Sequence, residues 1–151
     1  MSRTGQATAT ASRNDGLIAA MDLLHRARGT LDQASHAGTT NDRYIAAHLG
    51  ALRAAAALIA VRRSRTRPGR RGRLRTVWDE VAELAPELGE WSAYFAVCGH
   101  RRAAVEAGGH AAAREADDLL RAGQAFLALI QAALGVPVTR GASVLAVTGR
   151  P

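Results

Sequence analysis

Apolar side chains recur every three or four positions between residues 77 and 98, and this spacing constrains the fold more than any other feature of the chain. The apolar face consists of Val77, Val81, Leu84, Leu88, Trp91, Phe95 and Cys98. A repeat near 3.6 residues places these side chains on one side of an α-helix, which must then be buried against other elements. Pro86 interrupts the pattern, because proline lacks an amide donor and crowds the preceding turn. We therefore predict either a kink or two helices that meet at Pro86.

The same periodicity predicts three further helices. One covers about residues 15–36, has Asn14 or Asp15 as its N-cap, and presents Leu17, Met21, Leu24 and Leu31 on its apolar face. The next begins after Thr40 or Asn41, and its expected core face comprises Ile45, Leu49, Leu52, Ala56 and Ile59. The last covers about residues 110–134 and ends at Gly135; its apolar face comprises Ala116, Leu119, Leu120, Gly123, Phe126, Leu127, Ile130 and Leu134. Because no segment has a strand pattern, we predict an all-α, up-and-down bundle of four to five helices.

The length of 151 residues and the hydrophobic content of 48% are sufficient for one domain with a substantial core. We place the bundle at residues 15–134. Residues 1–14 are rich in Ser, Thr and Ala, and residues 135–151 lack a helical pattern, so both segments are predicted to be disordered tails.

The single cysteine, Cys98, excludes an intramolecular disulfide and is typical of a reducing compartment, so we predict a cytoplasmic protein. The longest apolar run, residues 54–61, is far shorter than the roughly 20 residues that cross a bilayer, and no membrane span is predicted.

The positive charge is concentrated in residues 62–75, which we call the Arg-rich segment. It contains eight of the twenty arginines and no acid; they are Arg62, Arg63, Arg65, Arg67, Arg70, Arg71, Arg73 and Arg75. The rest of the chain has twelve arginines against thirteen acids and is close to neutral. Pro68, Gly69 and Gly72 oppose helix formation, so we predict a loop that meets phosphate groups of nucleic acid rather than an ordered recognition helix.

Three alternatives remain for these arginines. They can be merely solvated, they can contact a protein or anionic lipid, or they can be neutralised by acids of the same chain. The nearest acids are Asp79, Glu80, Glu83, Glu87 and Glu90. Glu80, Glu83, Glu87 and Glu90 are spaced as one face of a helix, which we call the glutamate stripe and expect to be solvated rather than catalytic.

Three segments resemble a small actinobacterial branch of the HEPN superfamily: "DRYIAAHLGALRAAAALIA" at residues 42–60, "WDEVAELAPELGEWSAYFAV" at residues 78–97 and "AREADDLLRAGQAFLALIQAAL" at residues 113–134. The resemblance implies a compact bundle of four or five helices that is often a homodimer. It also implies a relation to proteins many of which cleave RNA without a metal, whereas others only bind nucleotides or proteins.

In the catalytic members of the superfamily, an arginine and a histidine four to six residues apart handle protons and phosphate charge during attack by the ribose 2′-hydroxyl. Arg43 and His48 match this spacing. Five residues of helix turn by about 140°, however, so one protomer does not readily bring the two side chains together. We therefore interpret His48 as a packing or interface histidine and Arg43 as a surface charge. The alternative is a dimeric ribonuclease that uses Arg43 and His48 across its interface, and a further alternative is a non-catalytic protein-interaction bundle.

No other residues form a convincing site, and no metal or cofactor is predicted. Cys98 and His100 lie about 160° apart on a helix, so we interpret Cys98 as a core thiol and His100 as a surface imidazole even with His110 nearby. Trp78 and Trp91 fit the core better than a stacking platform for bases. Tyr44 falls outside the centre of its helix's expected core face and can be exposed. Asp117 and Arg121 have the spacing of a helical ion pair, to which we assign no function.

Overall fold

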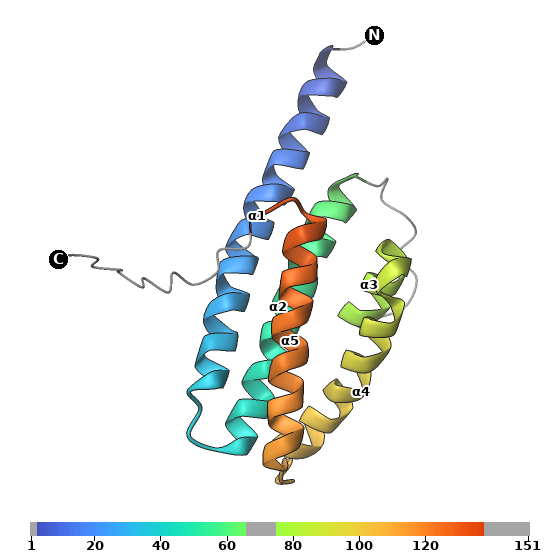
Figure 1. The fold of residues 1–151 in the computed structure, drawn as a ribbon. Helices are drawn as coiled ribbons and strands as arrows, with labels where there is room; N and C mark the ends of the chain where they lie inside the picture. The colour runs from blue at the N-terminus through green and yellow to red at the C-terminus, as the bar shows by residue number, and fades with distance from the viewer. Residues whose placement is uncertain (1–2, 66–74, 138–151) are drawn as a thin grey trace, which may run out of the picture.

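The computed structural model describes residues 3–65 and 75–137, and within these ranges it contains helices and no strand. The helices are α1 (Arg3–Ser35), α2 (Thr40–Arg65), α3 (Val77–Leu84), α4 (Gly89–Glu106) and α5 (Ala113–Ala133), with a short 3-10 helix, η1 (Pro86–Leu88), between α3 and α4. Successive long helices run in alternating directions and pack side by side (Figure 1). The predicted all-α, up-and-down bundle is therefore confirmed.

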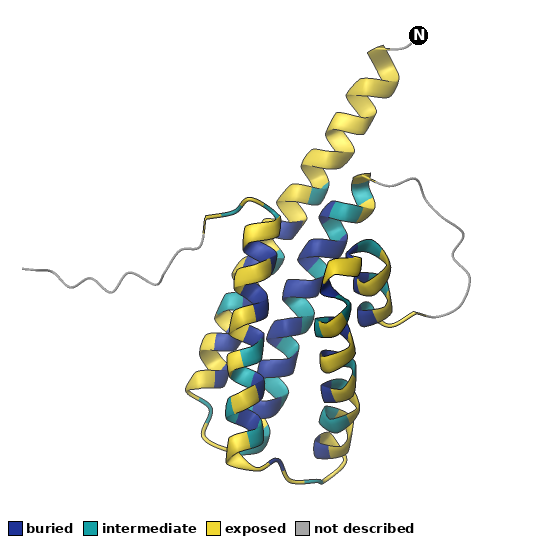
Figure 2. Ribbon diagram, turned by 45° about the vertical axis from the view of Figure 1, so that its right-hand side comes forward, coloured by how far each residue is buried: buried dark blue, intermediate teal, exposed yellow. Residues whose placement is uncertain are grey.

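The α2 helix is the centre of the bundle and is buried on several sides, because α1, α3, α4 and α5 all pack against it (Figure 2). Five of its buried residues are alanines: Ala47, Ala51, Ala54, Ala55 and Ala57. Of the face expected for this helix, only Ile59 is buried, whereas Ile45, Leu49, Leu52 and Ala56 are half-buried. A helix with neighbours on several sides has no single apolar face, which is why this prediction was only partly correct: Ile45 and Leu52 pack against the core without being buried in it. Tyr44, for which the sequence left exposure open, is also buried.

An aromatic cluster joins α3, α4 and α5. The ring centroids of Trp78 and Phe95 lie 4.9 Å apart, and those of Phe95 and Phe126 lie 5.0 Å apart. Trp91 packs 5.8 Å from Phe126 at the edge of the cluster. Both tryptophans therefore belong to the core, as the sequence predicts.

The helix boundaries around Pro86 follow from local hydrogen bonding. Thr76 begins α3 with a capping box, in which its hydroxyl accepts from the amide of Asp79 while the Asp79 carboxylate accepts from the amide of Thr76. The α3 helix ends at Leu84, and Pro86 opens η1, where it needs no amide partner. Two helices thus meet at the proline, which is one of the two predicted outcomes.

The N-terminal boundary differs from the prediction. Residues 3–14, expected to be part of a disordered tail, continue α1 as a helix, so neither Asn14 nor Asp15 is its N-cap. This segment is rich in alanine, the best helix former, and the hydroxyls of Thr8 and Thr10 bond to carbonyls one turn earlier, which satisfies them within the helix. All of residues 3–15 are exposed, and α1 projects beyond the bundle (Figures 1 and 2).

The remaining boundaries concern the Arg-rich segment and the C-terminus. The α2 helix continues to Arg65, so Arg62, Arg63 and Arg65 are helical rather than part of a loop. The α5 helix ends at Ala133, and Gly135 follows with a positive φ of 69°, a normal helix stop. Of the predicted C-terminal tail, residues 138–151 lie outside the described residues.

By length and composition alone, α2 is apolar enough to cross a membrane. Most of its apolar stretch is, however, buried among the other helices, as in the core helix of a soluble protein. The described residues therefore contain no clear membrane span.

Candidate nucleic-acid interface

Arg62, the first arginine of the Arg-rich segment, forms polar contacts with other helices of the same chain. Arg62 donates a hydrogen bond to the carbonyl oxygen of Leu84 at 3.0 Å and forms an ion pair with Glu87 at 2.7 Å. A cation at the last carbonyl of α3 is favoured there, because the C-terminal end of a helix carries partial negative charge. The pKa of Glu87 lies below its usual value, first through its own backbone amide and then through Arg62. Arg62 thus links the end of α2 to α3 and η1.

Two further arginines of the segment also pair with the glutamate stripe. Arg63 forms an ion pair with Glu80, and Arg75 forms one with Glu83. About half of each arginine side chain stays exposed. The expectation of a solvated stripe is therefore only partly correct, because three of its four members neutralise arginines of the same chain. The other predicted contacts, Arg67, Arg70, Arg71 and Arg73, lie outside the described residues.

Arg65 has a different environment at the end of α2. Its side chain is exposed and makes no hydrogen bond or ion pair with the residues that the structure describes. It is therefore the arginine of the segment whose charge, within residues 3–65 and 75–137, has no counterpart.

His48 and Arg43, the candidate catalytic pair of the ribonuclease alternative, have separate partners. His48 is buried, and its Nε2 donates to the carbonyl oxygen of Phe95 at 3.0 Å while its Nδ1 accepts from Arg102 at 3.1 Å. A carbonyl only accepts and a guanidinium only donates, so the ring is held as the neutral Nε2–H tautomer. Burial lowers the pKa of His48 most strongly, and Arg102 lowers it further.

Arg43 is half-buried rather than a free surface charge. It forms an ion pair at 2.5 Å with Asp117, which joins α2 to α5. The predicted pair between Asp117 and Arg121 is consequently not formed, and Arg121 pairs instead with Asp118 at 2.9 Å. An intrahelical pair is weak and easily replaced by a partner on another helix.

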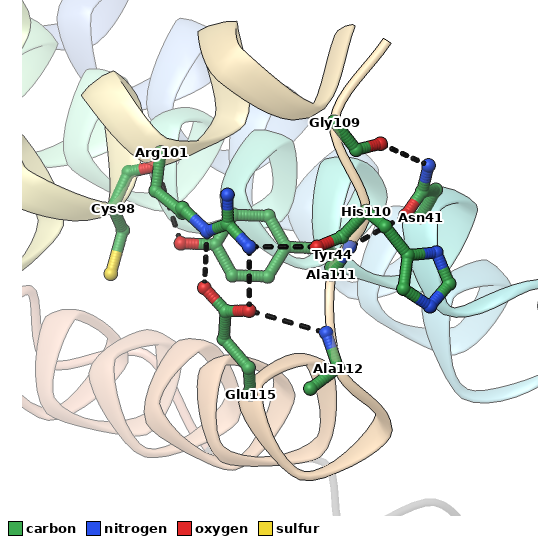
Figure 3. Close-up of polar contacts among 9 residues, drawn as sticks. All are labelled: Asn41, Tyr44, Cys98, Arg101, Gly109, His110, Ala111, Ala112 and Glu115. Carbon is green, nitrogen blue, oxygen red and sulfur yellow. Dashed lines mark hydrogen bonds and ion pairs between the residues drawn. The ribbon is translucent and has the colours of Figure 1, made fainter.

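The residues that the sequence failed to single out are Arg101, Arg102 and Glu115. Arg101 donates to both carboxylate oxygens of Glu115 and to the carbonyl of His110, so it fastens the turn between α4 and α5 (Figure 3). Asn41 links the same turn to α2, because its side-chain amide donates to the Gly109 carbonyl and accepts from the backbone amide of Ala111. These contacts join residues up to 70 positions apart, and no local pattern signals them.

Cys98, predicted to be a core thiol, is buried, and burial raises its pKa. The Tyr44 hydroxyl donates to the Cys98 carbonyl oxygen at 3.4 Å (Figure 3). Within the described residues, no group of three His, Cys, Asp or Glu side chains could hold a metal ion.

A family model described as SAV_6107-like HEPN matches residues 34–131, more than half of the chain. The chain belongs to the SAV_6107-like HEPN family. No curated protein and no solved structure matches it.

The HEPN match extends from the last turn of α1 almost to the end of α5. It contains Arg43, His48 and the whole Arg-rich segment, and it agrees with the helical bundle described above. The long exposed part of α1 lies outside the matched residues, so the HEPN match does not account for it.

Proposed function

We propose that this HEPN protein binds nucleic acid, RNA in preference to DNA, through its Arg-rich segment, without base specificity and without catalysis. The observation that carries the proposal is the concentration of arginines where α2 ends, in a chain that is otherwise close to neutral. Guanidinium groups suit phosphate because they donate two parallel hydrogen bonds to its oxygens. Membership of the HEPN family, which is often nucleic-acid related, supports nucleic acid as the partner, and the preference for RNA follows from the RNA-cleaving proteins to which the resemblance relates the chain.

The ion pairs with the glutamate stripe do not prevent such binding. An exposed ion pair is worth about 0–1 kcal/mol and is screened by salt. Contacts to several phosphates release condensed counterions and add together, so a polyanion outcompetes separate carboxylates. Arg63 and Arg75 are half-exposed and can exchange partners in this way. Arg62 is more enclosed and holds the Leu84 carbonyl, so we expect it to contribute less to binding than to stability.

The contacts of His48 support binding rather than cleavage. A general base must accept a proton from the ribose 2′-hydroxyl, and a general acid must reach the leaving oxygen. His48 is 2% exposed, and both ring nitrogens are occupied by protein groups. Arg43 is engaged by Asp117 on α5, whereas the partners of His48 lie on α4. A ribonuclease built on this pair would need both sets of contacts to break.

The test is fluorescence anisotropy with labelled 20-nucleotide single- and double-stranded RNA and DNA at two salt concentrations. We expect RNA to bind, with little dependence on sequence and a strong decrease in affinity with salt. A variant that retains Arg62 and carries serine at the other seven arginines of the segment should lose binding but keep its helicity and melting temperature. Unchanged binding by that variant, or no binding by the wild type at low salt, contradicts the proposal. Sedimentation of the same samples measures whether the protein is the homodimer that the family resemblance implies.

A further inference from the structure

The exposed part of α1 lies beside the end of α2 and forms a groove with it. The two helices touch at Gly16, where a Cβ atom would lie 2.8 Å from the Ser64 hydroxyl and 2.9 Å from the Ala60 carbonyl. Beyond this contact a groove of about 360 Å³ is lined by Ala9, Arg13, Ser64 and Arg65. One wall therefore belongs to α1, the other belongs to α2, and each contributes one arginine.

The two arginines share this groove without a counter-charge. Neither the Arg13 side chain nor the Arg65 side chain forms a hydrogen bond or ion pair with a described residue. The α1 wall brings no acid, because its lining residues are Ala9 and Arg13; Asp15, the first acid of α1, is not among the residues that line the groove. Two like charges at the walls of one groove repel each other, and an anion between them relieves this repulsion.

The surface of α1 also limits the kind of partner. Residues 3–15 present mainly Ala, Thr, Ser, Gln and Arg, all exposed, so this stretch offers no apolar stripe to a partner helix. Its small side chains let an extended backbone approach closely, and its charge favours an anionic one.

We propose that the groove between α1 and α2 is a phosphodiester-binding site, in which Arg13 and Arg65 hold successive phosphates of a nucleic-acid strand. This proposal rests on the function proposed above and extends it from the Arg-rich segment to α1. The site then has two walls of helix, which approach closely at Gly16. Arg13 is a binding residue in the part of α1 that precedes the residues matched by the family model.

The first experiment removes the two charges. The variant R13S/R65S is compared with R114S/R121S, which has the same net charge but loses two exposed arginines of α5. Both are titrated with labelled RNA across a salt series. If each groove arginine neutralises one phosphate, the slope of log affinity against log salt should become shallower by about 1.4–1.8 in R13S/R65S only. Equal slopes in the two variants contradict the proposed site.

The second experiment adds a charge to the groove and keeps every arginine. Ala9 lies one turn before Arg13 and lines the groove, whereas Ala7 lies about 200° away from Ala9 around the helix. Ala9→Glu should weaken RNA binding at least tenfold, and Ala7→Glu should weaken it much less. Circular dichroism checks that both variants keep the wild-type helicity. Equal effects of the two glutamates overturn the proposal.

The outcomes separate this site from the function on which it rests. Wild-type binding that is unaffected by R13S/R65S and Ala9→Glu leaves the Arg-rich segment as the binding element and rejects the groove. A wild type that binds no oligonucleotide rejects both. Titration with inorganic phosphate tests the other source of the same chemistry. If the wild type binds phosphate but no oligonucleotide, and R13S/R65S loses phosphate binding, the ligand of the groove is a small anion and not a nucleic-acid strand.

Discussion

His48 donates a hydrogen bond from Nε2 to the carbonyl oxygen of Phe95, which ties the centre of α2 to α4 at 3.0 Å. On the other side of the ring, Nδ1 accepts from Arg102. Protonation of Nδ1 would remove this acceptor and place a second cation against the guanidinium group in a buried site. The folded state therefore requires neutral His48.

The first prediction follows from this requirement. The pKa of His48 is lower in the folded protein than its usual value of 6.5, so the unfolded chain binds more protons as the pH falls below that value. We expect the contribution of His48 to stability to be complete well above pH 6.5 and to decrease as the pH falls from about 6.5 toward its folded pKa. Urea denaturation at pH 7.5, 6.5 and 5.5 measures this decrease.

The matched variants are His48→Gln and His25→Gln. A glutamine at position 48 can donate to Phe95 and accept from Arg102 but does not titrate, so the dependence of stability on pH should flatten. His25 is exposed, and its replacement should leave the dependence as in the wild type. If His48→Gln shows the wild-type decrease, the decrease comes from other groups.

The second prediction concerns catalysis. Because His48 is buried and occupied on both nitrogens, we expect purified protein to show no metal-independent RNA cleavage, and His48→Gln to leave any background unchanged. Incubation of labelled RNA in excess EDTA measures this. A cleavage activity that disappears in a folded His48→Gln protein would instead favour the ribonuclease alternative.

The third prediction concerns the competition between glutamates and nucleic acid. Glu80 pairs with Arg63, whereas Glu90, another member of the glutamate stripe, forms no ion pair within the described residues. Glu80→Gln should strengthen RNA binding, by up to about fivefold for a pair worth at most 1 kcal/mol. Glu90→Gln removes the same charge and should change the affinity less. Anisotropy titrations at low salt measure both, and the same gain in both variants would show a general charge effect rather than competition for Arg63.

The fourth prediction concerns the core. Leu127 is 7% exposed and Leu58 is fully buried, so replacing either by alanine should destabilise the protein by about 2–5 kcal/mol through a cavity. Leu52 is only half-buried, and Leu52→Ala should cost less. Denaturation midpoints rank the three variants. A Leu52→Ala variant as unstable as the other two would mean that α2 is packed more tightly on that side.

The fifth prediction compares two glycines of α1. A Cβ atom at Gly16 would lie 2.9 Å from the Ala60 carbonyl oxygen, whereas one at Gly29 would meet nothing within 4 Å. Gly29→Ala should stabilise the protein by about 0.5–1 kcal/mol, because alanine is the better helix former. Gly16→Ala should destabilise it and separate α1 from α2. Thermal melts distinguish the two, and equal melting temperatures would mean that the contact at Gly16 adjusts without cost.

How much of this structure could be predicted depended on how many sides of each helix are buried. The helices on either side of Pro86 bury one face each, so the spacing from Val77 to Cys98 was sufficient to place them. The α2 helix is buried on several sides, and five of its eleven buried residues are alanines, so larger residues such as Leu52 misplaced the core face. Residues 3–14 have no apolar pattern, so the periodicity did not signal that α1 extends through them.

The sequence was sufficient to predict where the charged residues of the candidate site lie along the chain, but not which residues they contact. The Arg-rich segment and the glutamate stripe are visible in the sequence, and their pairing was one of the alternatives. The contact between His48 and Arg102 spans 54 positions and joins different helices, so it depends on the packing of α2 against α4. The approach of Arg13 to Arg65 similarly depends on how α1 and α2 cross.

The alanines that bury α2 also restrict how the protein can change over evolutionary time. At Ala51, Ala54, Ala55 and Ala57, each fully enclosed, any larger side chain must force neighbouring helices apart, and only glycine is smaller. Glycine in turn lowers the stability of a helix by about 1 kcal/mol at each interior position, relative to alanine. Natural variation should therefore avoid these four positions and collect on the exposed faces of α4 and α5, so that the surface can diverge while these positions of α2 stay small.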